Sequence, residues 1–173
     1  RLIKLWAKKN NKKYIITFEG SYHGRVLGSD LIGGTPNSTA WSNVVDDDIC
    51  FLSFPKDGEE LDIDKLPPLD EIAAFFLETY QGWGALFYPQ KYIDKLYKIA
   101  KENNILFCFD EVQSGFYRMG PLYGYMTYGD YEPDIITVGK GLTSSLPLSA
   151  VLSTKDIIDI DIKANLSSTH AGN

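Results

Sequence analysis

The sequence predicts an α/β fold with three layers, in which a mostly parallel β-sheet lies between helices on both of its faces. Strand-like and helix-like segments alternate along the 173 residues, which is typical of parallel strands joined by helices. Several strand-like segments are short, continuous apolar runs, as expected of strands that are buried on both faces. The length suits one domain with a sizeable core.

The amino-terminal half is expected to hold a helix, two strands and a long loop. Apolar residues at positions 2, 5 and 6 fall on one helical face, so the chain begins inside or at the edge of a helix. Residues 14–18 and 49–52 are largely apolar and predict strands. Residues 21–47 are rich in Gly, Ser, Asn, Thr and Asp, and so long a loop in a compact domain is usually functional or partly disordered.

The middle of the chain holds the clearest helix. Residues 62–70 are expected to be a connector or a short helix, and the apolar run 72–77 predicts a buried strand. Pro89 then opens a helix, and Asn103 lies where it ends. The apolar side chains of this helix recur at the i, i+3, i+4 and i+7 positions: Ile93, Leu96, Tyr97 and Ala100.

Three further strands are predicted after this helix. Residues 105–110 and 134–139 are apolar runs that each lead to a charged residue. Residues 148–152 predict a final strand that is antiparallel or lies at an edge of the sheet. The whole sheet is therefore expected to contain about six strands, most of them parallel.

Three of the predicted strands end in a charged residue, namely Glu78, Asp110 and Lys140. Open parallel sheets bind ligands at the edge where the strands end. A carboxylate and an amine at that edge suit one chemistry well, because a lysine can form a Schiff base with pyridoxal phosphate while an aspartate keeps the pyridine nitrogen protonated. Asp110 and Lys140 are therefore the candidate catalytic residues.

Each candidate also has an ordinary structural interpretation. A lysine after a strand is usually a solvated loop residue, and an aspartate at a strand end often caps the next turn. For Lys140, the flanking Gly139 and Gly141 would let a flat cofactor approach, and burial would lower the proton affinity of the amine. Gln113 can donate a hydrogen bond to the phenolic oxygen of the cofactor or remain a surface amide. Val112 can pack on the cofactor ring or belong to the core.

Two polar segments supply further candidates. Tyr22 and His23 lie in a glycine-flanked turn, where an aromatic ring can stack on a flat ligand or simply pack within the loop. Ser167, Ser168 and Thr169 lie in a polar loop whose hydroxyl and backbone N–H groups can bind a phosphate.

Composition restricts the partners and the compartment. The net charge of −6 argues against a nucleic-acid or anionic-membrane surface, and no apolar stretch reaches the ~18 residues that a membrane span needs. Cys50 and Cys108 lie within or beside apolar runs and predict reduced thiols, which favours a cytoplasmic protein. Two cysteines and two scattered histidines give no metal-ligand spacing.

Five motifs together resemble one enzyme family. Residues 110–120 read Asp-Glu-Val-Gln-Ser-Gly-Phe-Tyr-Arg-Met-Gly and closely resemble the signature of class-III pyridoxal-phosphate aminotransferases. Residues 133–141 resemble the lysine segment of the family, at the expected distance. The family's aromatic-His-Gly, Glu-Pro-x-Gln-Gly and Thr-x-x-Gly-Asn elements are matched by residues 21–25, 78–82 and 168–173. The five motifs occur in the family's order.

The resemblance implies a fold-type-I, aspartate-aminotransferase-like large domain and a transamination reaction. The implied cofactor is pyridoxal 5′-phosphate, and the implied substrates are a small-molecule amino donor and a keto acid or aldehyde acceptor. Lys140 would hold the cofactor as a Schiff base and later move a proton between substrate Cα and cofactor C4′. Asp110 would bind the pyridine nitrogen. Glu78 would lie near the cofactor and orient the groups that bind it.

The remaining motif residues would contact the cofactor directly. Tyr22 and Val112 would sandwich its ring, and Gln113 would contact its phenolic oxygen. His23 belongs to the aromatic-His-Gly element and is included among the cofactor-binding residues. Thr169 would bind the cofactor phosphate of the partner subunit, since the family builds its sites at the interface of a homodimer.

The sequence also departs from the family pattern. Thr79 stands where the family usually has proline, and Trp83 stands near the place of an acidic gate residue, which indicates either a different substrate pocket or plain core packing. The phosphate-binding loop of the family is expected before Arg1, and its small domain beyond Asn173. Residues 1–173 are therefore expected to be an incomplete cofactor-binding large domain.

Two alternatives remain open at the level of sequence. Aminomutases, racemases and decarboxylases share the first steps on the same scaffold, although Gln113 favours an aminotransferase over an aminomutase. The other alternative is a structural fragment that binds no cofactor and does not catalyse by itself.

Overall fold

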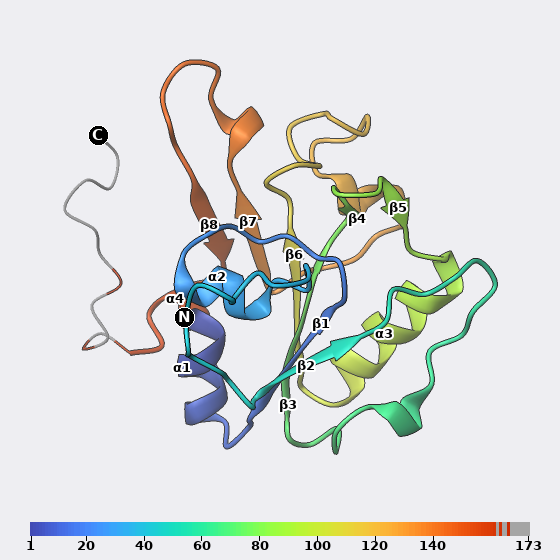
Figure 1. Cartoon of the computed structure of the whole chain (residues 1–173). Helices are drawn as coiled ribbons and strands as arrows, with labels where there is room; N and C mark the ends of the chain where they lie inside the picture. Colours follow the sequence, from blue (N-terminus) through green and yellow to red (C-terminus); the bar gives the residue numbers. More distant parts are fainter. Residues whose placement is uncertain (162, 164–165, 167–173) are drawn as a thin grey trace.

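The computed structural model describes residues 1–161, 163 and 166, and it contains a six-stranded sheet in the order β2-β1-β3-β6-β7-β8 (Figure 1). Neighbouring strands run parallel except for β7 and β8, which are antiparallel. The prediction of a mostly parallel sheet with an antiparallel edge strand is confirmed. The strands are β1 (Tyr14–Phe18), β2 (Ile49–Leu52), β3 (Ile72–Glu78), β6 (Leu106–Asp110), β7 (Ile135–Val138) and β8 (Ala150–Ser153).

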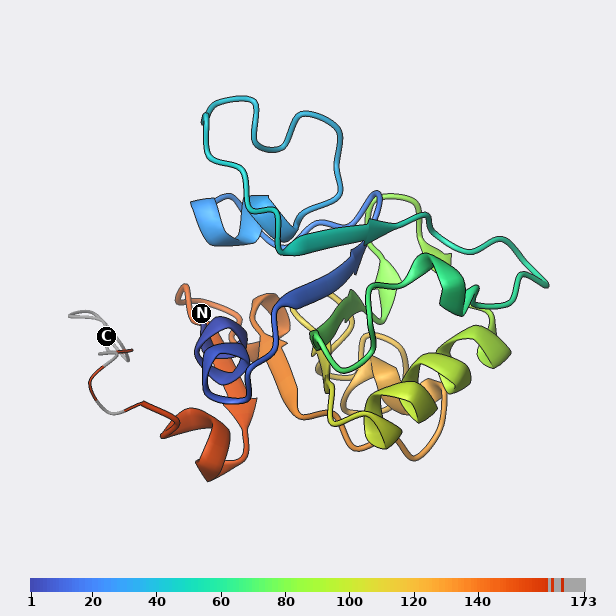
Figure 2. The same ribbon diagram turned by 90° about the horizontal axis from the view of Figure 1, so that it is seen from below.

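Helices cover both faces of the sheet, as the sequence predicts (Figure 2). Helix α1 (Leu2–Lys9) and the short α4 (Lys155–Ile158) pack on one face, where Trp6 lies in an apolar cluster with residues of β3 and β6. Helix α3 (Gln90–Glu102) packs on the other face, where Ile93 lies in the larger apolar cluster. Since side chains alternate along a strand, β3 and β6 contribute to both clusters and are buried along their whole length.

Helix α3 and strand β6 follow the sequence pattern closely. Pro89 precedes the first helical residue with a φ of −57°, which suits a helix start, where its missing N–H leaves no intrahelical bond unmade. Asn104 adopts the left-handed region at φ +49°, which asparagine tolerates well, and β6 begins two residues later. The buried face of α3 consists of Tyr92, Ile93, Leu96, Ile99 and Ala100.

Helix α2 (Leu27–Ile32) lies within residues 21–47, which the composition predicts to be a loop, so that prediction is wrong for these six residues. The hydroxyl of Ser29 donates to the carbonyl of Val26 and accepts from its N–H, which stabilises the start of the helix. Farther along, Trp41 donates its indole N–H to the buried Asp30 carboxylate at 2.8 Å. These side-chain hydrogen bonds stabilise α2, which is too short to show the apolar periodicity of a longer helix.

The remaining elements are short. A hairpin of β4 (Tyr80–Gln81) and β5 (Leu86–Phe87) follows β3 directly. Three 3₁₀ turns are η1 (Ile63–Lys65), which lies in the expected connector, η2 (Gly124–Thr127) and η3 (Lys140–Leu142). Within the described residues, no helix has the length and apolar character needed to cross a membrane.

The carboxyl ends of β3, β6 and β7 lie side by side. Glu78 pairs in register with Asp110, which pairs in turn with Thr137. Side chains in register on neighbouring strands point to the same face, and Phe76 and Cys108, two residues earlier, belong to the cluster under α1. Glu78, Asp110 and Thr137 therefore share the α1 side of the sheet at the edge where ligands bind in open parallel sheets.

Gly34 is required by a close approach between two segments, because a Cβ at this position would lie 2.1 Å from the Phe18 carbonyl oxygen. We expect Gly34→Ala to lower the free energy of unfolding by about 2–3 kcal/mol, since the backbone must shift. Gly28→Ala in α2 is the matched control: nothing lies within 4 Å of the added Cβ, so that variant should be unchanged or slightly stabilised. Urea denaturation measures both, and wild-type stability of Gly34→Ala would contradict the packing described.

Candidate active site

Asp110 is a firmly held polar side chain at this edge. It is only 7% exposed, and its carboxylate accepts three hydrogen bonds. His23 Nδ1 lies 2.8 Å from Oδ2, while the Val112 N–H and the Thr137 hydroxyl both donate to Oδ1 at 3.0 Å. The donors come from the loop after β1, the turn after β6 and strand β7. The carboxylate orientation is therefore fixed by three separate parts of the chain.

His23 is buried beside this carboxylate, with a side chain that is 1% exposed. Its ring meets Phe76 edge-on, with centroids 4.7 Å apart. Because Nδ1 faces a carboxylate, the proton of the neutral ring is assigned to Nδ1. The structure places His23 where it orients Asp110, whereas Nε2 is buried and has no hydrogen-bond partner among the described residues.

Glu78 connects the loop after β1 to the β4–β5 hairpin. It is 5% exposed, and its two carboxylate oxygens accept hydrogen bonds from the N–H groups of Tyr22 and Gly82, each at 3.2 Å. Burial raises the pKa of this carboxyl group, although the nearby His23 and the two N–H groups favour its charged form. Glu78 therefore holds the backbone of two segments that border the site.

Lys140 begins η3, directly after β7, and its amine donates to Gln113 Oε1 at 2.7 Å. Its φ of +38° lies in the left-handed region, which costs a non-glycine residue roughly 1–2 kcal/mol. Gly82 lies against the same amide, since a Cβ there would be 3.0 Å from Gln113 Oε1. Gly139 packs on Val112, whose Cγ1 would be 3.3 Å from an added Cβ.

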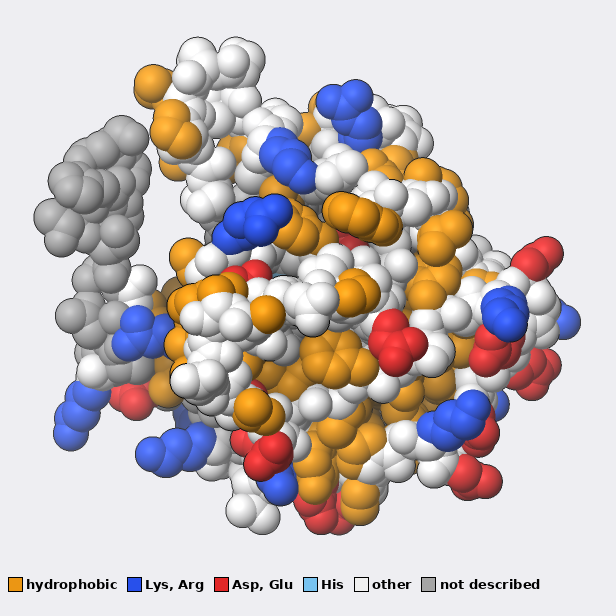
Figure 3. Space-filling view, in the orientation of Figure 1, with side chains coloured by type: hydrophobic (Ala, Val, Ile, Leu, Met, Phe, Trp, Pro, Cys, Tyr) orange, Lys and Arg blue, Asp and Glu red, His pale blue; other side chains and the backbone are white. Residues whose placement is uncertain are grey.

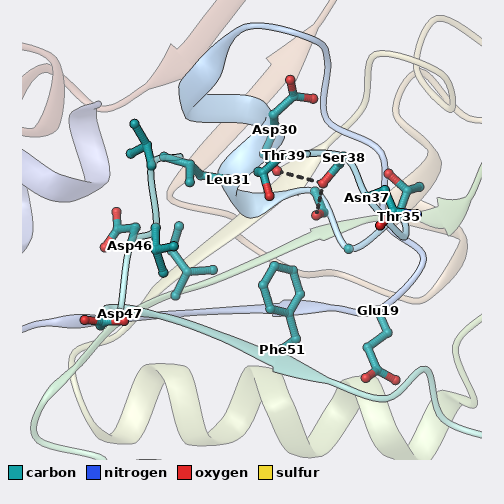
Figure 4. A pocket seen from close by; sticks show the side chains of 15 residues that line it. Glu19, Asp30, Leu31, Thr35, Asn37, Ser38, Thr39, Asp46, Asp47 and Phe51 are labelled. Carbon is teal, nitrogen blue, oxygen red and sulfur yellow. Dashed lines mark hydrogen bonds between the residues drawn. The ribbon is translucent and has the colours of Figure 1, made fainter. Parts of the chain in front are cut away.

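A cavity of about 550 Å³ opens elsewhere, between α2, β2 and residues 33–47 (Figure 4). The ring of Phe51 points from β2 into it, and the Ser38 hydroxyl donates to the carbonyls of Asp30 and Gly33 at 3.2 Å. A smaller cavity of about 390 Å³ lies at Lys140 itself. Its other lining residues are Thr143, Leu146, Pro147, Leu148 and Ser149. The larger cavity includes none of the predicted site residues, so the smaller one is the relevant space.

The structure brings most of the predicted site residues to one edge of the sheet. Asp110, His23 and Val112 are in direct contact, Glu78 is bonded to the backbone of Tyr22, and Lys140 is bonded to Gln113. The Tyr22 ring is 40% exposed, with the Arg25 guanidinium carbon 5.7 Å from its centroid. Thr169 lies outside the described residues.

Three residues of the site have no counterpart among the sequence candidates. Thr137 holds Asp110, and the pair Thr79 and Glu111 is hydrogen-bonded on the opposite face of the sheet. The sequence offers one signal for Thr137: it lies near the end of the strand that leads to Lys140, and this strand is expected to pair with the strand that ends at Asp110. Trp83 is 85% exposed, so its interpretation as a core residue is wrong. Among the described residues, no three His, Cys, Asp or Glu side chains are arranged to hold a metal ion.

Comparison with known proteins agrees with this geometry. The family model described as "Aminotransferase class-III" matches residues 1–173. The chain belongs to the class-III aminotransferase family. Isoleucine 2-epimerase of Lentilactobacillus buchneri is 34% identical, and acetylornithine aminotransferase of Lactiplantibacillus plantarum is 33% identical; each match covers 99% of this chain and 43% of the relative. The chain thus spans less than half the length of these relatives.

Solved structures show the same fold. A transaminase obtained by ancestral reconstruction superimposes with a TM-score of 0.80 at 28% identity, covering 98% of this chain and 42% of that chain. An S-selective transaminase from Arthrobacter sp. gives a TM-score of 0.77 at 26% identity, with the same two coverages. The fold is that of the transaminases of fold type I, as the sequence motifs imply.

Class-III aminotransferases use pyridoxal phosphate, and the residues present fit that cofactor. Asp110 Oδ1 already accepts two hydrogen bonds, whereas Oδ2 accepts only one and has a lone pair left for a protonated ring nitrogen. The Lys140 amine is exposed at the edge of a cavity, where an aldehyde can reach it. A carboxylate for one end of the ring and an amine for the other are therefore present.

Glu78 predicts a pH dependence of stability. Its ordinary pKa of 4.5 is raised in the folded protein, so its contribution to stability is complete below pH 4.5 and is lost as the pH rises through the folded-state pKa. We expect the free energy of unfolding of wild type, relative to Glu78→Gln, to fall as the pH rises above 4.5. Urea denaturation at a series of pH values measures the difference. A difference that stays constant or grows with pH would contradict the burial of an ionising group.

Proposed function

We propose that the full-length protein is a pyridoxal-phosphate-dependent aminotransferase, which moves an amino group from a small-molecule donor to a keto acid or aldehyde. The observation that supports this most strongly is the Asp110 carboxylate, buried and held by three donors at the strand edge that also carries Lys140. An acid for the ring nitrogen and an amine for the aldehyde are the two groups that this cofactor requires of a protein. Family membership supports the same activity.

In this proposal, the bound cofactor supplies an aldehyde that condenses with amines and a protonated ring that withdraws electrons from the substrate Cα. Asp110 binds the ring nitrogen and keeps it protonated, and His23 keeps the carboxylate in position. The Lys140 amine holds the cofactor and, once the donor has displaced it, removes the proton from Cα and returns it at C4′. The same two residues then act in reverse on the acceptor.

The other candidates shape the space around the ring. Tyr22 and Val112 are proposed to pack on its two faces, and the Gln113 amide to hydrogen-bond its phenolic oxygen. Glu78 supports Tyr22 through the backbone N–H of that residue. These roles exclude water from the ring and hold it in one orientation.

Residues 1–173 are proposed to be the cofactor-binding large domain, and the 43% coverage of the curated relatives supports a longer parent protein. We propose a homodimer in which Thr169 reaches the cofactor phosphate of the partner subunit. Apolar side chains exposed on the face of α2 and β2 support such an interface (Figure 3). They include Val26, Leu27, Trp41, Val44, Val45 and Phe51. The unpaired thiols of Cys50 and Cys108 support a cytoplasmic location.

Lys140→Ala in the full-length protein tests the proposed function. We expect wild type with added pyridoxal phosphate to gain a visible absorption band at longer wavelength than that of the free aldehyde, and borohydride reduction followed by peptide mass spectrometry to place the pyridoxyl group on Lys140. Lys140→Ala should lose both and lower kcat by at least ~10³-fold, because no amine is left to hold the cofactor or move the proton. Lys155→Ala, an exposed lysine on α4, is the control and should behave like wild type.

A band that survives in Lys140→Ala, or a pyridoxyl group on another lysine, would refute the assignment. A wild type that gains no band at all would refute the cofactor and with it the enzyme.

A second candidate function is epimerisation at the same site, because isoleucine 2-epimerase is a relative at 34% identity. Both reactions begin with removal of the Cα proton and differ in where the proton returns. Incubation with a chiral amino acid separates them: an epimerase inverts the configuration without an acceptor, whereas an aminotransferase forms more than one equivalent of keto product per site only as the acceptor is consumed.

A further inference from the structure

Glu111 is the neighbour of Asp110, yet its side chain points to the opposite face of the sheet and is completely buried. It accepts four hydrogen bonds, which fill the acceptor sites of a carboxylate. The donors are the N–H groups of Gly124 and Tyr125 and the hydroxyls of Ser114 and Thr79. A carboxylate in this position is tolerated only because every acceptor site has a donor.

Thr79 differs from the other three donors in where it comes from. Ser114, Gly124 and Tyr125 follow Glu111 in the chain, whereas Thr79 follows the last residue of β3. The backbone pairing of β3 with β6 ends at Glu78 and Asp110. One residue beyond the end of both strands, the Thr79 hydroxyl donates a hydrogen bond to the Glu111 carboxylate. This side-chain contact joins the end of β3 to the segment that follows Asp110.

Glu111 in turn fixes the turn that carries Val112 and Gln113. Its N–H donates to the Thr137 carbonyl at 2.8 Å, and its own carbonyl accepts from the Gly115 N–H at 2.9 Å. A Cβ on Gly115 would lie 2.8 Å from that carbonyl oxygen, so only glycine fits at this position of the turn. Gln113 lies inside this hydrogen-bonded turn, two residues after Glu111.

We propose that Thr79 is a positioning residue of the cofactor site: its hydroxyl holds Glu111, and Glu111 holds the turn that presents the Gln113 amide to Lys140. The inference rests on the proposed function, because the site it positions is the one assigned to pyridoxal phosphate. Loss of the hydroxyl leaves one acceptor site of a buried carboxylate without a donor. The carboxylate must then move toward another donor, and Gln113 moves with it.

The test measures affinity for pyridoxal phosphate in the full-length protein by absorbance titration, together with stability by urea denaturation. Thr79→Val removes the hydroxyl and keeps the shape, and we expect it to raise the dissociation constant about five- to tenfold. Thr79→Ser keeps the hydroxyl and should restore the affinity to within about twofold of wild type. Rescue by serine separates the hydrogen bond from the packing of the threonine methyl group.

Thr17→Val is the matched control. Thr17 is also completely buried and donates its hydroxyl to the Ile32 carbonyl at 3.2 Å, on β1 and away from Glu111. It should lose stability as Thr79→Val does but keep the wild-type affinity for the cofactor. Equal losses of affinity in both variants would show that Thr79 affects cofactor binding only through the overall stability of the fold, and would overturn the inference.

A double-mutant cycle with Gln113→Ala tests the route of the effect. If Thr79 acts through Gln113, Thr79→Val should have little further effect on affinity in the Gln113→Ala background. Additive losses would overturn the inference, as would wild-type affinity of Thr79→Val. If Thr79→Val does not fold, Ser114→Ala removes a donor from the other oxygen of Glu111 and must give the same non-additivity with Gln113→Ala.

The experiment distinguishes failure of the proposed function from failure of the positioning role of Thr79. Failure of wild type to bind pyridoxal phosphate refutes the proposed function. Normal binding by wild type together with normal binding by Thr79→Val refutes only the positioning role.

Discussion

The hydrogen bonds to the Asp110 carboxylate are the contacts on which the rest of the site depends. Its three donors come from the loop after β1, the turn after β6 and strand β7, so the carboxylate is in place only when all three segments are. The register of β6 and β7 sets Thr137 opposite Asp110, and the packing of His23 on Phe76 sets the imidazole behind it. The chemistry at this edge is thus a consequence of sheet pairing and core packing.

Side-chain alternation divides the same edge into two polar groups. Glu78 and Asp110 point toward the α1 side, where the cofactor is proposed to bind, while Thr79 and Glu111 point toward the α3 side. Burying a carboxylate without donors costs several kcal/mol, and each of the three carboxylates at this edge has its donors. The group on the α3 side is completely buried, and its proposed contribution is to hold the group on the α1 side.

Much of the fold follows from local pattern, and little of the site's fine geometry does. Helix α3 and strand β6 are predictable because helical periodicity and a continuous apolar run are properties of one segment. Helix α2 and the β4–β5 hairpin are not, because both are too short to show a periodic pattern, and α2 also depends on contacts such as Trp41 with Asp30. Asp110 and Lys140 can be found from strand ends and motif resemblance. The roles of Thr137, Thr79 and Glu111 depend on strand register, which the sequence does not reveal directly.

The proposal that Asp110 keeps the pyridine nitrogen of the cofactor protonated is tested most directly by nitrogen-15 NMR. The full-length protein would be loaded with pyridoxal phosphate labelled at the ring nitrogen and compared with its Asp110→Asn variant, which has no charge to stabilise a pyridinium. We expect the chemical shift of a protonated ring nitrogen in wild type at neutral pH and that of an unprotonated one in the variant. The same shift in both proteins, or an unprotonated nitrogen in wild type, would contradict the proposed role of this carboxylate.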